Sequence, residues 1–351
     1  MVTKEAVMHV LSGIDDPELR KPLTELDMVK FVNIDGGHVE VGITLTVPGC
    51  PLKARIAEDV ENGLKLIEGV EGVKVEFDVM TDEQRAKLRE KLGMGSQPGA
   101  AGTPIVNFAK RFVAVSSGKG GVGKSTVTAN LAAALAKMGK KVGLLDADVY
   151  GFSIPRMLGI TGQPTIIDDK IIPLRRGEMQ VVSMGFFIDE DEPVIWRGPL
   201  LHKAINQFIS DVMWDELDYL FLDLPPGTGD VTLTIAQAIP AAELLVVTTP
   251  QATATHVAGR VAKLAEKTNL KVIGVVENMA YYENNGKRDY IFGQDGGKNL
   301  AKKLGVKLLG EIPLLTSIRE GADSGKPVAD SGSAHEMEVF AQIARNLEAK
   351  A

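Results

Sequence analysis

The sequence predicts an α/β protein in which a small α+β domain precedes a doubly wound, mostly parallel sheet. Two observations support this prediction. After residue 110, short continuous apolar runs alternate with helical stretches, as in parallel sheets that are covered by helices on both faces. A stretch of small and turn-forming residues, 93–104, separates this pattern from an N-terminal part of mixed helices and strands. We therefore expect a domain at 1–92, a linker at 93–104 and a second domain at 105–351.

The N-terminal part contains segments with helical periodicity and segments with strand alternation. They are a helix at 6–14, a half-buried strand at 38–47, an amphipathic helix at 53–67, a strand at 73–79 and a charged helix at 82–92. Roughly 90 residues lie within the usual size of an independent domain. This order of elements predicts a small α+β unit.

The second part contains short apolar runs that we interpret as buried strands. They are 111–117, 141–148, 180–185, 218–225, 243–250, 271–279 and 307–314. Helical stretches such as 125–139 and 256–269 lie between them. Strands that alternate with helices predict a doubly wound parallel sheet. The C-terminal stretch 334–350 has a mixed polar face and apolar residues at helical spacing, so we expect it to pack on the core.

Composition restricts the possible function classes. The chain is 44% apolar and 24% charged, which is ordinary for a soluble globular protein. A net charge of −7 gives no general attraction to nucleic acid. No apolar run approaches the ~18 residues of a membrane span, and the N-terminus lacks the pattern of a signal peptide. A single cysteine excludes an intrachain disulfide framework. We expect a cytoplasmic protein without a nucleic-acid or membrane partner.

A glycine-rich loop follows the first strand of the second part and opens its first helix. The segment SSGKGGVGKST, residues 116–126, matches G-x-x-x-x-G-K-[ST], which is typical of a P-loop NTPase domain. Glycines let backbone N–H groups surround phosphate oxygens, Lys124 neutralises the β- and γ-phosphates, and the Ser125 hydroxyl ligates Mg²⁺. The candidate nucleotide-binding residues are Gly118, Lys119, Gly120, Gly121, Val122, Gly123, Lys124, Ser125 and Thr126.

Carboxylates follow two of the predicted strands. Asp146 and Asp148 end the run LLDAD, and we expect Asp146 to help hold Mg²⁺ and Asp148 to position the attacking water. Asp223 ends the run LFLD, which is the place of a carboxylate that holds Mg²⁺ through water. The turn after it contains Gly227, whose amide is a candidate sensor of the γ-phosphate. An isolated aspartate at a strand end is more often a cap, but two after a phosphate loop indicate function.

The loop carries a second lysine, Lys119, and in this form it resembles the signature of the MinD/ParA/nitrogenase-iron-protein class of ATPases. In that class the early lysine crosses a dimer interface to the partner's nucleotide. The resemblance therefore implies a homodimer closed by ATP, with Lys119 and Lys124 in catalytic roles. Asn278 and Pro313 match positions that contact adenine in the class. Taken as bare residues, both are equally well explained as turn formers.

A longer set of motifs resembles a narrower family. The segments DADVYGFSIPRML, WRGPLLHKAINQFISDVMW, DYLFLDLPPGTGD and IFGQDGGKNLAKKLGVKLLGEIPL are similar to the Mrp/ApbC family of iron–sulfur cluster carrier ATPases. The N-terminal segments DDPEL, LDMVKFVNI and ITLTVPGCPL resemble the metal–sulfur cluster assembly domain that is often fused ahead of bacterial members. The resemblance implies a slow, Mg²⁺-dependent ATPase that carries a labile cluster between scaffold proteins and apoprotein acceptors.

The number and position of cysteines in this chain differ from those in the family. Many members have C-x-x-C after the Asn-Met step, whereas this chain reads ENMAYYENNGKRDYIFG from Glu277. The only thiol is Cys50, between a predicted strand and a helix that Pro51 begins. A helix start lowers a thiol pKa and favours metal binding, whereas buried cysteines are commonly inert. Because thiolates are the usual cluster ligands, Cys50 is our candidate iron–sulfur ligand, shared across a dimer or with external thiols.

Two other functions compete with cluster carriage. The missing C-x-x-C favours an ATP-switched scaffold that regulates protein contacts without its own cluster. The loop by itself is also compatible with a MinD/ParA-like positioning ATPase. A membrane-bound version calls for a basic amphipathic helix, which the mixed polar face of 334–350 does not provide, and a DNA-bound version calls for a basic patch.

Overall fold

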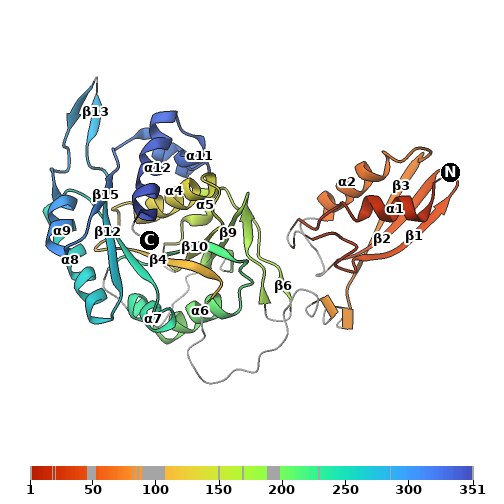
Figure 1. Ribbon diagram of the computed structural model, residues 1–351, viewed down its shortest axis with the longest axis horizontal. Coiled ribbons are helices and arrows are strands. Elements are labelled where there is room, and N and C mark those ends of the chain that lie inside the picture. The colour runs from red at the N-terminus through yellow and green to blue at the C-terminus, as the bar shows by residue number, and fades with distance from the viewer. Residues whose placement is uncertain are drawn as a thin grey trace. The chain divides into compact units, whose positions relative to one another are not determined.

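The computed structural model is shown in Figure 1. The structure describes residues 2–17, 19, 21–45, 53–81, 83–84, 87–88, 107–148, 151–167, 170–187, 198–227, 230–284 and 286–349. They belong to two compact units, one of Met1–Gly102 with Thr165–Ile172 and one of Thr103–Pro164 with Pro173–Ala351. The predicted linker lies outside the described residues, so the predicted domain boundaries stay a prediction.

The first unit contains a three-stranded sheet and two helices. The elements are α1 (Lys4–Leu11), β1 (Val29–Asp35), β2 (His38–Leu45), α2 (Lys53–Leu64) and β3 (Gly72–Val79). The central strand β2 pairs antiparallel with β1 and parallel with β3. The helix α2 therefore forms the crossover between the two parallel strands, as the predicted α+β order requires.

Apolar side chains at helical spacing hold this unit together. The hydroxyl of Thr3 accepts a hydrogen bond from the Ala6 N–H at 3.2 Å and begins α1. The helices α1 and α2 pack on each other, and α1 contacts β1 while α2 contacts β3. The buried residues of the two helices are Val7, Leu11, Ile56, Val60 and Leu64.

The prediction for the first unit was incomplete. It missed β1, because the burial of VKFVNID never reaches a fully buried position and so gives only a weak strand pattern. The predicted strand at 38–47 begins at the observed residue and is described as far as Leu45. The predicted helix at 82–92 lies largely outside the described residues.

The second unit is built on an eight-stranded sheet. Its order is β15-β12-β11-β4-β10-β5-β9-β8, and every neighbouring pair is parallel except β8 and β9. The strands are β4 (Ala109–Ser117), β5 (Val142–Asp146), β8 (Leu174–Arg176), β9 (Met179–Ser183), β10 (Leu217–Asp223), β11 (Glu243–Thr248), β12 (Lys271–Glu277) and β15 (Leu308–Glu311). All seven predicted strands are members, which confirms the predicted mostly parallel sheet.

Helices cover both faces of this sheet (Figure 1). The helices are α4 (Lys124–Lys137), α5 (Ile154–Leu158), α6 (Gly198–Ser210), α7 (Asp230–Ala238), α8 (Ala252–Lys267), α9 (Gly296–Leu304), α10 (Thr316–Asp323), α11 (Val328–Ser331) and α12 (Ala334–Glu348), with a 3₁₀ turn η1 (Met184–Phe186). On one face α4 packs against the central strands and against α11 and α12, and on the other α8 packs against β4, β11 and β12. The predicted packing of the C-terminal helix is confirmed, since Phe340, Ile343 and Leu347 of α12 are buried.

The sequence analysis did not predict the shortest strands. They are β8 and the hairpins β6 (Ile166–Ile167) with β7 (Lys170–Ile171), and β13 (Tyr282–Asn284) with β14 (Lys287–Asp289). Strands of two or three residues are too short to show an alternation. The exposed hairpin β13–β14 projects from the second unit in Figure 1.

Topology brings three predicted strand ends together. β4 lies beside β10, and β10 lies beside β5, so the chain passes over β10 on its way from β4 to β5. The register aligns Asp223 at the end of β10 with Asp146 at the end of β5 and with Val115 near the end of β4. Ligands of doubly wound sheets bind at such a carboxyl edge, where the strand order reverses.

Candidate nucleotide site

Two glycines of the loop between β4 and α4 stand where the structure leaves no room for a side chain. Gly123 adopts φ +79° at the start of α4, and a Cβ there would overlap the side-chain nitrogen of Asn278. A Cβ on Gly118 would overlap the backbone nitrogen of Ala258 in α8. The side chain of Val122 is buried, whereas Gly120 and Gly121 are exposed. The loop is thus anchored at its ends and open in its middle.

A buried carboxylate organises the start of α4. The Lys124 ammonium lies 2.7 Å from Oδ2 of Asp223, and the Ser125 hydroxyl donates to the same oxygen at 2.6 Å. The other oxygen of Asp223 accepts from the Thr128 hydroxyl at 2.7 Å. Both Lys124 and Asp223 are buried, so their attraction is weakly screened. The structure therefore brings together three residues that the sequence placed in one site, two of them as Mg²⁺ ligands.

The carboxylate of Asp146 is used inside the protein. Its Oδ1 accepts from the Asp148 N–H at 3.1 Å, and its Oδ2 accepts from the Ile154 N–H at 3.3 Å and from the Ser183 hydroxyl at 3.0 Å. These bonds hold the segment that carries Asp148. Within the structure Asp146 positions its neighbours, and its expected contact with Mg²⁺ stays a prediction.

Asp148 borders the loop directly. Its Oδ2 lies 3.8 Å from the Lys124 ammonium, and its side chain lines a cavity of about 220 Å³ formed by residues 119–126 with Pro226. The structure thus places Asp148 beside the phosphate loop, and its expected role of orienting a water stays a prediction.

Lys119 and Gly227 have partners within the chain. The Lys119 ammonium donates to Oε1 of Gln251, immediately before α8, at 3.0 Å. The Gly227 N–H donates to the Ser117 carbonyl at 2.9 Å, with Gly227 at φ +101°. The single Gly227 N–H is thus occupied by Ser117, whereas the Lys119 ammonium keeps two further N–H donors beside its bond to Gln251.

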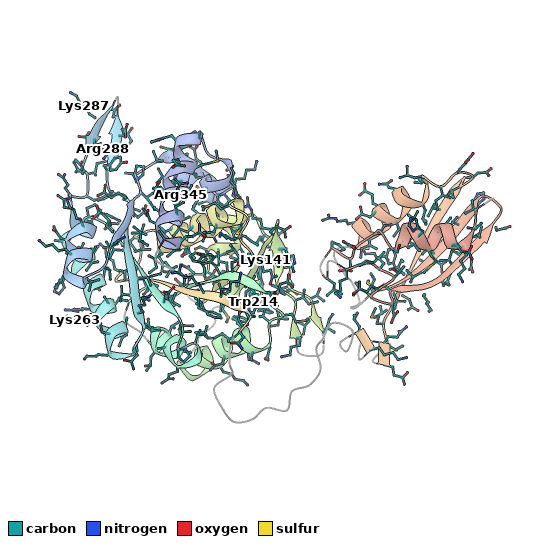
Figure 2. All side chains as sticks on the ribbon, viewed as in Figure 1. Lys141, Trp214, Lys263, Lys287, Arg288 and Arg345 are labelled. Atoms are coloured by element: carbon teal, nitrogen blue, oxygen red, sulfur yellow. The ribbon has the colours of Figure 1, made fainter. Side chains whose placement is uncertain are left out.

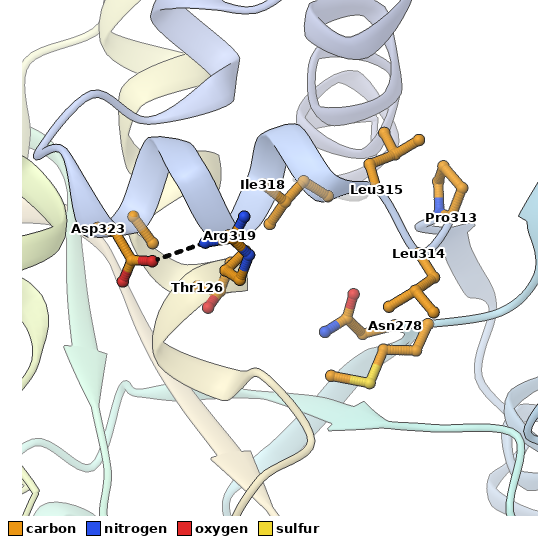
Figure 3. A pocket seen from close by; sticks show the side chains of 10 residues that line it. Thr126, Asn278, Pro313, Leu314, Leu315, Ile318, Arg319 and Asp323 are labelled. Atoms are coloured by element: carbon orange, nitrogen blue, oxygen red, sulfur yellow. Dashed lines mark hydrogen bonds and ion pairs between the residues drawn. The ribbon is translucent and has the colours of Figure 1, made fainter.

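A second cavity continues from the loop, with Thr126 as the shared residue. It measures about 230 Å³ and is lined mainly by apolar side chains, with Asn278 on one side and Arg319 on the other (Figure 3). The remaining lining residues include Met279, Pro313, Leu314, Leu315 and Ile318. Asn278 also donates from Nδ2 to the Val122 carbonyl at 2.9 Å, which ties this cavity to the loop. An apolar slot beside a phosphate loop suits a flat base, and both residues expected at adenine lie there.

Sequence reasoning missed three supporting residues. The Thr128 hydroxyl donates to the Asp223 carboxylate, and the Ser183 hydroxyl donates to the Asp146 carboxylate. The amide oxygen of Gln251 accepts from the Lys119 ammonium. Thr128 had a usable signal, because it is a polar residue four positions after Lys124 on a helix that is otherwise rich in alanine and leucine. Ser183 ends the strand QVVS, where a polar residue also points to the carboxyl edge. The other candidate, Cys50, lies outside the described residues.

The buried state of Asp146 predicts a pH dependence of stability. Burial and the nearby Asp223 carboxylate raise the pKa of Asp146 to about 7, whereas an aspartate in an unfolded chain titrates near a pKa of about 3.9. Between these values the folded protein keeps a proton that the unfolded chain has released. The contribution of Asp146 to the free energy of unfolding therefore falls as pH rises from about 4 to about 7, by roughly 1.4 kcal/mol per pH unit.

Urea denaturation at constant ionic strength measures this slope. In Asp146→Asn we expect a shallower decline. Some decline remains, because burial also raises the pKa of Glu277 and contributes with the same sign. An unchanged slope in the variant contradicts the assignment to Asp146.

A phosphate loop at the carboxyl edge of a doubly wound parallel sheet defines a nucleotide-binding P-loop NTPase. The family model described as NUBPL iron-transfer P-loop NTPase matches residues 109–348, and the model described as iron–sulfur cluster assembly protein matches residues 4–77. The chain belongs to this family of iron-transfer P-loop NTPases, with the assembly domain ahead of the NTPase. Both resemblances inferred from the sequence motifs are confirmed.

Relatives match both units. A protein of Mycobacterium leprae named iron-sulfur cluster carrier protein is 48% identical over 94% of this chain and 88% of its own length. One of Bacillus subtilis with the same name is 43% identical over 100% of this chain and 99% of its own length. Among solved structures, a nucleotide-binding protein of Archaeoglobus fulgidus in complex with ADP is 40% identical, with a TM-score of 0.55, and covers 63% of this chain and 88% of that chain.

Proposed function

We propose that this protein is a Mg²⁺-dependent ATPase that carries an iron–sulfur cluster and delivers it to apoproteins. The observation that carries the proposal is the contact of the buried Lys124 and Asp223 with the half-buried Ser125 at the end of the glycine-rich loop. Support also comes from relatives named iron-sulfur cluster carrier proteins, which match almost the whole chain, including its N-terminal unit.

The residues of the loop fit Mg²⁺ and ATP. Mg²⁺ prefers oxygen ligands, and the Ser125 hydroxyl and the Asp223 carboxylate are adjacent oxygens at the start of α4. The exposed backbone of Gly120 and Gly121 suits phosphate oxygens, and the cavity lined by Asn278 and Pro313 suits adenine. When bound, Mg²⁺ supplies positive charge that stabilises the transferring phosphate.

Hydrolysis begins with a change of partner at Lys124. The ammonium leaves Asp223 Oδ2 and turns to the phosphates, while Ser125 and Asp223 become free to bind the cation. Asp148 then orients the attacking water. Because a buried, short ion pair must open first, we expect a low basal rate.

A homodimer is part of the proposal. Lys119 lies at the edge of the loop, half-buried, and among the described residues its ammonium donates to a neutral amide, that of Gln251. Because the Gln251 amide is uncharged, little free energy is lost when Lys119 leaves it for the negatively charged phosphates of a partner's nucleotide. ATP therefore favours the closed dimer. A cytoplasmic location also belongs to the proposal. No helix in the described part of the chain is long and apolar enough to cross a membrane.

In this proposal the iron–sulfur cluster is bound by cysteine thiolates. Cys50 is the only cysteine, so two subunits supply two ligands and external thiols or a scaffold protein supply the others. The cluster then passes to apoprotein acceptors. Shared ligation makes the cluster labile, as a carrier requires.

Anaerobic reconstitution with iron and sulfide, in the presence of glutathione, tests cluster carriage. We expect the wild-type dimer to retain iron with charge-transfer absorbance and to transfer the cluster to an apo-ferredoxin, with Cys50→Ala near background in both measurements. ATP binding by Cys50→Ala serves as the control and should equal that of the wild type. Equal iron retention by both proteins removes Cys50 from the cluster site.

The absence of C-x-x-C after Asn278 favours one competing function, an ATP-switched scaffold. The same experiment separates the two. A wild-type protein that binds and hydrolyses ATP but neither retains nor transfers iron is a scaffold.

A further inference from the structure

The cavity that we assign to adenine, here called the base cavity, has one wall that the protein itself leaves uncovered. Of its lining residues, four come from α10: Ile318, Arg319, Ala322 and Asp323. This helix packs on α5 and α11, but none of its residues, all of which the structure describes, is buried. Ile318 packs on the core and is only partly buried. The wall formed by α10 therefore offers contact area that a ligand can cover.

Arg319 is the cation of this wall, and it lies across the base cavity from Asn278 (Figure 3). Thr126 lines both the base cavity and the cavity beside the phosphate loop. Arg319 is absent from the described lining of the cavity beside the phosphate loop. Its side chain is therefore placed at the part of the site that we assign to the base, and not at the part that we assign to the β- and γ-phosphates.

Two carboxylates of the same helix hold the Arg319 guanidinium. Its Nη1 donates to Oδ2 of Asp323 at 3.2 Å, as the dashed line in Figure 3 marks, and its Nη2 donates to Oε1 of Glu320 at 3.0 Å. The N–H groups of a guanidinium point outward in its plane, so both bonds are made at the edge of the group. The side chain is 63% exposed. Its flat faces are therefore available to a ligand while both edge bonds persist.

The same two carboxylates decide which part of a nucleotide suits this guanidinium. One positive and two negative side chains stand together at Arg319, Asp323 and Glu320, so the group as a whole is negative. A phosphate gains little from the cation and is repelled by the carboxylates. A purine base carries no net charge, and arginine stacks well on flat aromatic faces. The local charge therefore favours the base over the phosphates as the group that contacts Arg319.

We propose that Arg319 binds the adenine of the nucleotide by stacking its guanidinium on the base, on the side of the cavity opposite Asn278. This inference rests on the proposed ATP-binding function and adds a residue to that site. Stacking depends little on the identity of a base. Arg319 therefore supplies affinity, and the choice of adenine is left to polar groups such as the Asn278 amide. A bound base also covers part of the exposed wall of α10.

Isothermal titration of the full-length protein with ADP tests this proposal. Arg319→Ala removes the stacking group, Arg319→Lys keeps its charge without its plane, and Arg319→Tyr keeps a flat face without its charge. We expect Arg319→Ala to bind ADP at least about fivefold more weakly than the wild type. Arg319→Lys should remain at least about threefold weaker, whereas Arg319→Tyr should return to within about twofold of the wild type, because the plane and not the charge makes the contact.

Arg345→Ala is the matched control. Arg345, labelled in Figure 2, is an exposed arginine of α12 that donates to Glu338 and Gln342 of its own helix. This variant should bind ADP within about twofold of the wild type. Wild-type affinity in Arg319→Ala overturns the inference, and so does an Arg319→Tyr protein that binds no better than Arg319→Ala or Arg319→Lys. A wild-type protein that does not bind ADP overturns the proposed function itself, so the two failures are distinguishable.

Discussion

ATP hydrolysis by Lys124→Gln should fall at least about 100-fold below the wild-type rate. The ammonium is the buried cation that joins α4 to the carboxyl edge, through Asp223 at 2.7 Å, and it borders the phosphate cavity. Removing one fixed charge that stabilises a transition state typically costs about 10²–10³ in rate. Phosphate release at saturating ATP measures the loss.

Stability must be separated from chemistry in this variant. Glutamine leaves the buried Asp223 without its nearest cation, so the melting temperature should also fall. Rates are therefore compared well below both melting temperatures. The matched control is Lys137→Gln on the same helix, because Lys137 is exposed and its contacts within the described residues are the Asp330 carbonyl and the Met337 sulfur, away from the phosphate loop. A Lys124→Gln rate within tenfold of that control contradicts the proposed role.

Most of the fold was predictable because its signals are local. Seven strands of the large sheet gave continuous apolar runs, and the loop 116–126 gave the spacing of a phosphate loop at the junction of a strand and a helix. The missed elements, such as β1 and β8, are half-buried or very short, so periodicity does not distinguish them from loops. Their place in the sheets depends on pairing with distant strands.

The site was predictable where chemistry requires a particular residue. The structure brings Lys124, Ser125 and Asp223 together, as the motif predicted, and their roles toward phosphate and Mg²⁺ stay a prediction. The hydrogen-bond partners of Lys119 and Gly227 were not predictable from the sequence. Lys119 donates to Gln251, and the Gly227 amide donates to Ser117, because the fold brings distant segments together. Asp146 illustrates the limit. Its strand-end position suggested Mg²⁺, yet three internal donors from distant segments surround its carboxylate.

The response of ATP affinity to Mg²⁺ should disappear in Asp223→Asn. In the structure, Asp223 Oδ2 accepts from both the Lys124 ammonium and the Ser125 hydroxyl, so the carboxylate competes with phosphate for the lysine and becomes a cation ligand only after the lysine leaves. Asparagine keeps the size of the side chain but removes this charge. The lysine is then freer to meet phosphate, and we expect ATP affinity in EDTA to equal or exceed that of the wild type.

With Mg²⁺ present, the wild type should gain affinity while Asp223→Asn gains none, and hydrolysis by the variant should fall at least about 100-fold. Isothermal titration with and without Mg²⁺ measures the difference. Asp218→Asn is the matched control, because Asp218 lies on the same strand but pairs with Lys110 at the opposite end from the phosphate loop. It should keep the full Mg²⁺ effect. If Asp223→Asn also keeps the gain of ATP affinity with Mg²⁺, the role of Asp223 is to pair with Lys124. The cation ligand is then another carboxylate at this edge of the sheet, and Asp148, which borders the phosphate cavity, is the next to test.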